Sequence, residues 1–246
     1  MKDQVQTAVI LAAGEGKRIR NIVSDRPKGF IQLGILPIIE ESIIKLLNEN
    51  IKKIIIITGY RDNFYEQLKS KYAVIQTIRN SKYDESGSLF SLYCGRDLIN
   101  GDFLLLESDI IYESRAVAEL VHHPQKDVVL ISGFNNLGDE VYVQTDNGRL
   151  VNMSKDKEKL DNTEGEMVGI TKISFDSFRE LIKFTKREFQ KTLLLNYETD
   201  GLVALSKSKP VFCHKIVDLK WSEIDNEAHY QYVRDVLYQQ ISCGKG

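Results

Sequence analysis

The chain has 246 residues, of which 42% are hydrophobic and 28% charged, and a formal net charge of -2. The length suits one large α/β domain, and the near-neutral charge gives no reason to expect nucleic acid or an anionic membrane as a partner. Cys94, Cys213 and Cys243 are far apart, MKDQVQT lacks an apolar signal core, and no apolar run is long enough to span a bilayer. We therefore expect a cytoplasmic domain with reduced thiols.

The first half of the chain alternates short β-branched runs with amphipathic patterns. Strands are expected at 7–11, 53–58, 74–78, 103–106 and 128–132. Helices are expected from Pro37, from Tyr60 to about Lys69, from 88 to 98 and from 114 to 122. This order predicts an α/β fold with a doubly wound, mostly parallel, Rossmann-like sheet and right-handed crossovers.

The second half changes pattern and predicts a mixed sheet. Asp146-Asn147-Gly148 separates runs 141–145 and 149–153, which indicates a β-hairpin with a tight primed turn. A strand at 167–173, a helix at 175–188, a strand at 211–217 and a helix from 226 to about 239 follow. We expect one domain over 1–240, with 241–246 (ISCGKG) as a weakly structured tail or the start of a linker to a fusion partner.

A glycine-rich basic loop, LAAGEGKRIR (11–20), follows the first strand. Glycines permit a tight bend and close approach to a ligand, and backbone N–H groups with basic side chains suit phosphate oxygens. The loop lacks the Walker pattern and the third glycine of the dinucleotide fingerprint, which argues against a dehydrogenase. Taken alone, a solvated basic turn is an equal alternative.

Further motifs follow in order: RPKGFIQLG (26–34), IIIITGY (54–60), NSKYDESGSLFSL (80–92), LESDI (106–110) and WSEID (221–225). Together with LAAGEGKRIR they resemble the nucleotidyltransferase family, in its phosphocholine and phosphonate cytidylyltransferase branch. The chain is most similar to the 2-aminoethylphosphonate cytidylyltransferases. It departs from the family pattern at Gly29, at 34–37, and at Ser86, Gly87 and Ser88, where that branch often carries asparagines.

The resemblance implies an acceptor oxygen attacking the α-phosphorus of CTP, without a protein nucleophile and with Mg²⁺ as cofactor. Lys28 would hold the α-phosphate, and Lys17 and Arg18 the β- and γ-phosphates. Asp109 and Asp225 match the family's metal-binding aspartates, although each also reads as a turn or helix-capping residue. The implied nucleotide-binding residues are Leu11, Ala12, Ala13, Gly14, Glu15, Gly16, Lys28, Asn80, Ser86, Gly87, Ser88, Glu107 and Ser108.

The acceptor is expected to be a small phosphonate or phosphate with a primary amine. Lys155 resembles the family's second lysine, which meets the acceptor phosphate, and Trp221 is the one Trp of the acceptor half, residues 134–221. Glu166, Glu198 and Asp200 would accept hydrogen bonds from an ammonium group, and aromatic residues are too scattered to predict a quaternary-ammonium cage. Phosphocholine and sugar 1-phosphates remain alternatives, as does a nucleotide-binding regulatory module without turnover.

Overall fold

The computed structural model describes residues 4–23, 25–135, 138 and 140–243. The strands are β1 (Thr7–Ala12), β2 (Lys53–Thr58), β3 (Ile75–Arg79), β4 (Phe103–Glu107), β5 (Ile110–Tyr112), β6 (Val128–Ser132), β7 (Tyr142–Asp146), β8 (Arg149–Ser154), β9 (Gly165–Ile173), β10 (Phe212–Ile216) and β11 (Trp221–Glu223). The α-helices are α1 (Arg20–Val23), α2 (Ile38–Asn48), α3 (Asp62–Lys71), α4 (Ser88–Cys94), α5 (Arg115–His122), α6 (Phe175–Glu188), α7 (Val203–Ser206), α8 (Glu227–Tyr232) and α9 (Tyr238–Cys243). Short 3₁₀ or π turns are η1 (Lys17–Ile19), η2 (Lys28–Phe30), η3 (Lys157–Lys159), η4 (Tyr197–Leu202) and η5 (Val233–Leu237).

Nine strands form one mixed sheet in the order β3-β2-β1-β4-β9-β6-β10-β8-β7. The pairs β1–β2, β2–β3, β1–β4 and β6–β10 are parallel, whereas β9 lies antiparallel between β4 and β6. The predicted doubly wound, mostly parallel fold is therefore confirmed. A second, two-stranded sheet pairs β5 with β11, which the sequence analysis did not predict because each strand has only three residues.

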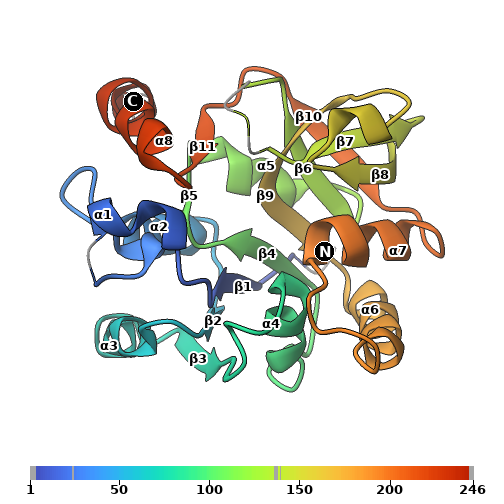
Figure 1. Ribbon diagram of the computed structural model, residues 1–246, viewed down its shortest axis with the longest axis horizontal. Helices are drawn as coiled ribbons and strands as arrows, with labels where there is room; N and C mark the ends of the chain where they lie inside the picture. The colour runs from blue at the N-terminus through green and yellow to red at the C-terminus, as the bar shows by residue number, and fades with distance from the viewer. Residues whose placement is uncertain (1–3, 24, 136–137, 139, 244–246) are drawn as a thin grey trace.

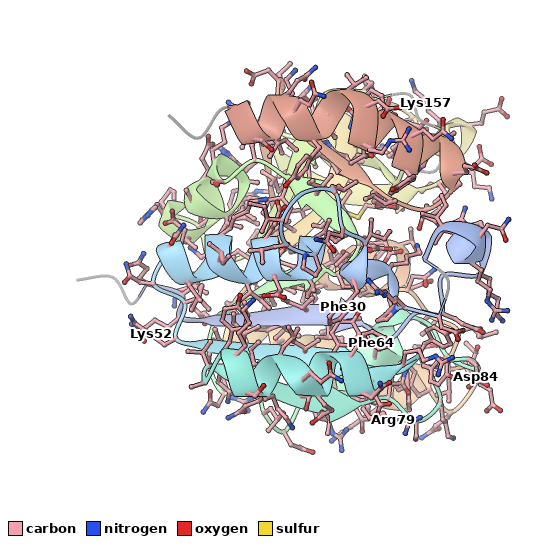
Figure 2. The ribbon with its side chains drawn as sticks, turned by 90° about the vertical axis from the view of Figure 1, so that its left-hand side faces the viewer. Phe30, Lys52, Phe64, Arg79, Asp84 and Lys157 are labelled. Atoms are coloured by element: carbon pink, nitrogen blue, oxygen red, sulfur yellow. The ribbon has the colours of Figure 1, made fainter. Side chains whose placement is uncertain are left out.

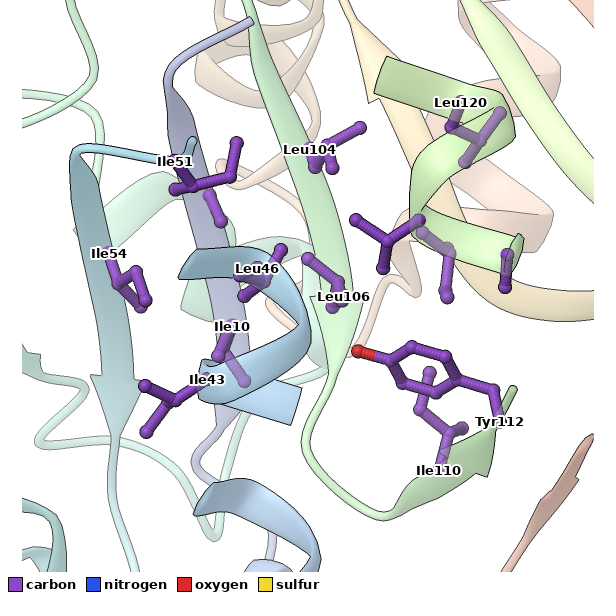
Figure 3. Packing of buried hydrophobic residues seen from close by; sticks show 14 of the residues in the cluster. Ile10, Ile43, Leu46, Ile51, Ile54, Leu104, Leu106, Ile110, Tyr112 and Leu120 are labelled. Atoms are coloured by element: carbon purple, nitrogen blue, oxygen red, sulfur yellow. The ribbon is translucent and has the colours of Figure 1, made fainter. Parts of the chain in front are cut away.

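Helices cover both faces of the large sheet (Figure 1). Alternate residues of the central strands point to opposite faces, as a strand's period of two requires. In β1, Ala8 and Ile10 join a core cluster with α2, α3 and α5, and Val9 and Leu11 join a second cluster with α4 and α6. The first cluster is drawn in Figure 3, where Ile43 and Leu46 of α2 face Ile10, and Leu104 and Leu106 line β4.

The hairpin β7–β8 follows its predicted turn. Asn147 and Gly148 have φ values of 50° and 72°, so both central residues adopt the left-handed conformation of a primed turn. The hairpin extends the sheet beyond β10 and also pairs β7 with β9.

The C-terminal helical segment differs from its prediction. It runs without a break through α8, η5 and α9 to Cys243, and Ile241 is buried in a cluster with Ile19, Ile31 and Ile38. Residues 241–243 are therefore helical and not the weakly structured tail that the sequence predicted. Packing of the Ile241 side chain against this apolar cluster stabilises the last helical turn. Residues 244–246 lie outside the described residues. None of the helices described is long and apolar enough to cross a membrane.

Candidate active site

The carboxyl ends of β1 and β4 lie side by side near the middle of the sheet. The register pairs Leu11 with Glu107, and the Ser108 backbone N–H donates to the Leu11 carbonyl over 3.1 Å. The glycine-rich loop after β1 and the Ser108-Asp109 turn after β4 therefore meet at one edge. Ligands of open α/β sheets bind at such an edge.

The two glycines of the loop have different roles. Gly16 has a φ of 63°, and a Cβ there would lie 2.8 Å from Cγ of Lys28, so both conformation and space require glycine. A Cβ at Gly14 would meet no atom within 4 Å. Gly14 lines a cavity, so its missing side chain leaves room for a ligand.

Lys28 is the centre of a charged cluster that joins three distant segments. Its Nζ donates to Oδ2 of Asp109 over 2.8 Å and also to Oδ1 of Asp225. Arg18 Nη2 lies 2.7 Å from the other Asp225 oxygen. The side chains of Lys28 and Asp225 are only 15% and 8% exposed, so these charges interact with little screening by solvent.

Packing behind Lys28 fixes its place. Phe30 follows in the same turn, and its ring contacts those of Phe64 and Tyr65 in α3 at centroid distances of 5.3 and 5.2 Å; Figure 2 labels Phe30 and Phe64. A Cβ at Gly29 would lie 3.0 Å from the Tyr65 hydroxyl and 3.2 Å from the Ser108 carbonyl. Gly29, one of the departures from the family pattern, thus permits this turn to approach the end of β4 closely.

Opposing charges set the ionisation of the cluster. Burial by itself lowers the pKa of Lys28, but Asp109 and Asp225 outweigh it and raise that pKa above its ordinary value. Burial raises the pKa of Asp225, but Lys28, Arg18 and Lys155 together hold it below its usual range. Lys28 is therefore a cation and Asp225 an anion at neutral pH.

A cavity of about 260 Å³ lies between the glycine-rich loop, the end of β4 and two further loops. Its lining residues are Leu11, Ala13, Gly14, Gly16, Lys28, Tyr65, Tyr83, Ser86, Gly87, Ser88, Ser91, Glu107, Ser108, Asp109, Asn196, Tyr197 and Glu198. A second hollow of about 320 Å³ shares Gly16, Lys28 and Tyr83 with it and is otherwise lined by Glu15, Lys17, Arg18 and Asp84. The basic hollow and the first cavity therefore adjoin at Lys28.

Most of the predicted nucleotide residues line one of these two spaces, but Ala12 and Asn80 lie behind them. Ala12 is part of the core. Asn80 is fully buried and orders the 80–88 loop: its Nδ2 donates to the hydroxyls of Ser86 and Ser91, each over 3.0 Å, and its Oδ1 accepts from the Lys82 backbone. Asn80 therefore shapes the cavity wall through other residues.

Residues 193–197, which no motif assigned to the nucleotide, form the opposite wall of the first cavity. Gly87 N–H donates to the Leu193 carbonyl over 2.8 Å, and a Cβ at Gly87 would lie 2.1 Å from the Leu195 carbonyl oxygen. Asn196 and Tyr197 from this segment line the cavity, as do Tyr65 and Tyr83. Sequence motifs gave no signal for Asn196 and Tyr197, because their position arises from pairing between segments about 110 residues apart, whereas Tyr83 belongs to the motif at 80–92.

Buried carboxyl groups gather beside Asp109. The Tyr197 hydroxyl donates to Oε1 of Glu107 over 2.7 Å, and the Ser88 hydroxyl lies 3.3 Å from Oε2 of Glu198. Burial, with the charges of Glu198 and Asp109, raises the pKa of Glu107 to about 8. Burial also raises the pKa values of Glu198 and Glu223, and Lys155 opposes both rises. Lys155 therefore lies within electrostatic reach of this carboxyl group cluster.

The other predicted acceptor residues are held by the protein itself. Glu166 is fully buried in β9 and accepts from the Asn135 backbone N–H over 2.7 Å, and Asp200 accepts from the Asn196 N–H over 2.8 Å. Trp221 is 2% exposed, belongs to the core, and donates from Nε1 to the Ser132 hydroxyl over 2.7 Å. Among the acceptor residues predicted, Glu198 is the one that lines the first cavity.

Two carboxylates, Asp109 and Asp225, present oxygen atoms to one cationic point, the Lys28 ammonium group. Hard oxygen ligands of this kind suit Mg²⁺, which takes one or two carboxylates and completes its shell with phosphate oxygens and water. Within the described residues, no group of three or more His, Cys, Asp or Glu side chains is arranged to hold a metal by itself. The donor set therefore fits a metal that arrives with a phosphate ligand.

Comparison of the sequence with models of known protein families identifies the family of this chain. The model of the nucleotidyl transferase family matches residues 7–136, more than half of the chain. The chain belongs to this family. It is a nucleotidyltransferase, as the ordered motifs of the sequence predicted, and the matched region contains the glycine-rich loop, Lys28 and Asp109.

Relatives of this nucleotidyltransferase include several cytidylyltransferases. A CTP:phosphoglutamine cytidylyltransferase of Campylobacter jejuni is 25% identical over 89% of this chain and 95% of its own length. A 2-aminoethylphosphonate cytidylyltransferase of Lancefieldella rimae is 24% identical over 75% of this chain and 74% of its own. The inositol-1-phosphate CTP transferase of T. maritima has the same fold, with a TM-score of 0.83 at 20% identity over 98% of this chain and 97% of its own.

Proposed function

We propose that this nucleotidyltransferase transfers CMP from CTP to a small phosphorylated or phosphonate acceptor and releases pyrophosphate. The observation that carries the proposal is the cluster of Lys28, Asp109, Asp225 and Arg18 at the junction of a narrow cavity and a basic hollow. The choice of CTP is supported by the resemblance of residues 80–92 to the cytidylyltransferase loop and by the names of the relatives.

In this reaction an acceptor oxygen forms a bond to the α-phosphorus of CTP. The bond from that phosphorus to the oxygen bridging to the β-phosphorus breaks, and pyrophosphate carries the electron pair away. Such transfer depends on alignment and charge neutralisation rather than on a protein nucleophile. The residues need only hold the reacting groups and offset negative charge.

Each residue of the cluster has a role that its position permits. Lys28 lies in the same short turn as Phe30, whose ring packs on α3. It would contact the α-phosphate, where negative charge builds up. Lys17 and Arg18, which line the basic hollow with exposed side chains, would reach the β- and γ-phosphates. Asp109 and Asp225 would hold Mg²⁺, which supplies further positive charge to the triphosphate. Lys155 would meet the acceptor's phosphate group.

For the acceptor we propose an aminoalkyl phosphonate or phosphate, with 2-aminoethylphosphonate first. The carboxyl group of Glu198, which lines the cavity, supports an acceptor with several hydrogen-bond donors, and Trp221 is packed in the core rather than open to a ligand. Primary ammonium groups donate three hydrogen bonds that such carboxyl groups accept. Phosphocholine and sugar 1-phosphates are the alternatives.

A pyrophosphate-release screen tests both levels of the proposal. CTP, UTP, ATP and GTP would each be paired with 2-aminoethylphosphonate, phosphocholine and glucose 1-phosphate. We expect CTP to exceed UTP and both to exceed the purines, with 2-aminoethylphosphonate the best acceptor. Faster release with a purine nucleotide across the panel would refute the base assignment, whereas a faster reaction with glucose 1-phosphate would refute only the acceptor.

A further inference from the structure

The polar side chains that line the first cavity differ in whether they already have a partner within the protein. Those in a hydrogen bond or ion pair with another residue belong to Lys28, Tyr65, Ser86, Ser88, Ser91, Glu107, Ser108, Asp109, Tyr197 and Glu198. Among the cavity-lining residues that the structure describes, Tyr83 and Asn196 have side-chain polar atoms without such a partner. Of these two, Asn196 carries an amide, whose separate donor and acceptor can pair with two adjacent atoms of a ligand.

Hydrogen bonds to the first residues of α4 fix the chain on both sides of Asn196. The Leu89 N–H donates over 3.1 Å to the carbonyl of Leu195, the residue before Asn196. The N–H of Tyr197, the residue after Asn196, donates to the Ser88 hydroxyl over 2.8 Å. Figure 1 shows the chain between α6 and α7 running beside α4. Asn196 therefore stays beside Ser88 and the loop that precedes it.

The backbone groups of Asn196 are themselves bonded. Its N–H donates to Oδ2 of Asp200 over 2.8 Å, and its carbonyl accepts from the N–H groups of Asp200 and Gly201 over 3.2 and 3.1 Å. Asn196 is also exposed, so a ligand in the cavity can reach its amide. The side chain is thus left to bind a ligand, and the backbone that holds it does not depend on the amide.

The lining of the cavity indicates which part of a nucleotide meets this amide. At Lys28 the cavity joins the basic hollow that would take the phosphates. Leu11, Ala13 and Gly14 give the cavity an apolar surface without long side chains. A flat base packs its faces on such a surface and directs its polar edge to the few hydrogen-bonding groups of a pocket. The uncharged amide of Asn196 therefore suits the base and not the phosphates.

We infer that Asn196 binds the polar edge of the pyrimidine base, an inference that rests on the proposed function for the identity of the nucleotide. Its Oδ1 accepts from the 4-amino group of cytosine, and its Nδ2 donates to the adjacent N3. The same amide, turned over, fits the corresponding edge of uracil, so this contact does not by itself set the preference for CTP over UTP. Asn196 has no part in the Lys28 cluster, so it governs nucleotide binding and not the chemical step.

Two variants and one control test this contact. Asn196→Ala removes both hydrogen bonds, whereas Asn196→Asp keeps the shape and the acceptor Oδ1 and removes the donor. Leu194→Ala is the matched control, because Leu194 belongs to the same segment, is 68% exposed and does not line the cavity. Since the Asn196 amide bonds to nothing in the described part of the chain, the thermal midpoint of Asn196→Ala should equal that of wild type.

The measurement is the dissociation constant of CMP compared with that of pyrimidin-2-one ribonucleoside 5′-monophosphate, which lacks the 4-amino group. One hydrogen bond corresponds to about 2–10-fold in affinity. We expect wild type and Leu194→Ala to prefer CMP by about that factor, and Asn196→Ala to bind the two ligands equally. Asn196→Asp should keep the preference, because its added charge acts on both ligands alike. A preference for CMP that survives in Asn196→Ala, or that wild type lacks, would overturn the inference.

Calorimetric titration with these monophosphates needs no turnover, so the inference and the proposed function can fail separately. In the pyrophosphate-release assay, Asn196→Ala should raise KM for CTP at least about fivefold, since two hydrogen bonds are lost, and leave kcat within about twofold. A fall in kcat at unchanged KM would contradict the binding role. A protein that loses its preference for CMP as expected but releases no pyrophosphate with any acceptor would refute the proposed transfer alone. Pyrophosphate release from CTP by a wild-type protein that binds the two monophosphates equally would refute the inference alone.

Discussion

Replacing Lys28 with methionine tests the centre of the site. Methionine preserves most of the side-chain volume between Gly16 and the two aspartates and removes only the charge. At an effective dielectric constant of about 20, two unit charges 4 Å apart interact by about 4 kcal/mol. The bound substrate phosphate already makes part of this interaction with Lys28. Turnover therefore falls only by the part of the interaction that is gained on going from the bound substrate to the transition state.

Loss of one preorganised donor of this kind costs about 10²–10³-fold in kcat, or about 2.7–4 kcal/mol. We therefore expect kcat of Lys28→Met to fall at least 10²-fold in a continuous pyrophosphate-release assay with saturating CTP. Lys17→Met is the matched comparison, because Lys17 is 70% exposed and pairs with Glu15 at the surface. It should lose no more than about tenfold, mainly through a higher KM for the nucleotide.

Stability must be followed alongside activity, because Lys28 also neutralises Asp109 and Asp225. Breaking a buried ion pair costs about 3–5 kcal/mol, but Arg18 still pairs with Asp225 in the variant, so a loss of about 1–3 kcal/mol in the free energy of unfolding is expected. Denaturant titration measures it, and the assay is run where the variant is folded. Turnover within threefold of wild type in a folded Lys28→Met protein would show that Lys28 is a structural cation and not a catalytic one.

Three further predictions concern the metal, the glycines and a helix cap. Chelation with EDTA should abolish pyrophosphate release and added Mg²⁺ restore it, whereas Asp109→Asn should lose at least about 10²-fold even at high Mg²⁺; activity that survives chelation would refute the metal. Gly16→Ala should impair turnover and lower the thermal midpoint, since a Cβ there would lie 2.8 Å from Lys28, whereas Gly14→Ala should leave the midpoint unchanged; equal midpoints would refute this difference. Asp127→Ala should lower the free energy of unfolding by about 1–3 kcal/mol without changing KM, because its carboxylate accepts from both N and Oγ of Ser174 at the start of α6; denaturant titration checks it, and a loss below 0.5 kcal/mol would contradict the reasoning.

Local sequence signals predicted the fold to a useful extent. The short β-branched apolar runs and the Asn147-Gly148 turn were sufficient, because burial on both sheet faces selects continuous apolar strands and positive φ values select Asn and Gly. The end of the C-terminal helix was misjudged, because Ser-Cys-Gly-Lys-Gly carries no helical pattern and only tertiary packing of Ile241 extends the helix. The predicted helix over 88–98 likewise stops at Cys94, where Gly95 follows.

The site was predictable only where a motif carried it. Lys28, Asp109 and Asp225 stand in recognisable motifs, and the structure brings their charged groups together. The contact of Glu107 with Tyr197 joins residues 90 positions apart, and no spacing in the sequence announces it. Phe134 and Tyr142 looked like scattered aromatic residues, because the sequence does not show that a loop and a strand start place their rings together. Trp221 was predicted to contact the acceptor, but its large apolar ring packs in the core.

The charge arrangement at Lys28 explains how one cluster can serve both folding and transfer. Lys28 and Arg18 share Asp225, and Lys28 also pairs with Asp109, so two cations balance two anions and no charge is left uncompensated. If a metal with a triphosphate enters, as the proposed function requires, the aspartates gain a divalent cation as partner and the two basic side chains gain phosphate oxygens. Each group then exchanges one opposite charge for another, so binding does not require any of the four to become buried and unpaired. A residue that lost its partner in this exchange would cost several kcal/mol. The same reasoning predicts that loss of either aspartate impairs the whole cluster. Before the nucleotide binds, Lys28 has one partner fewer. After it binds, the metal that the proposed function requires has one ligand fewer.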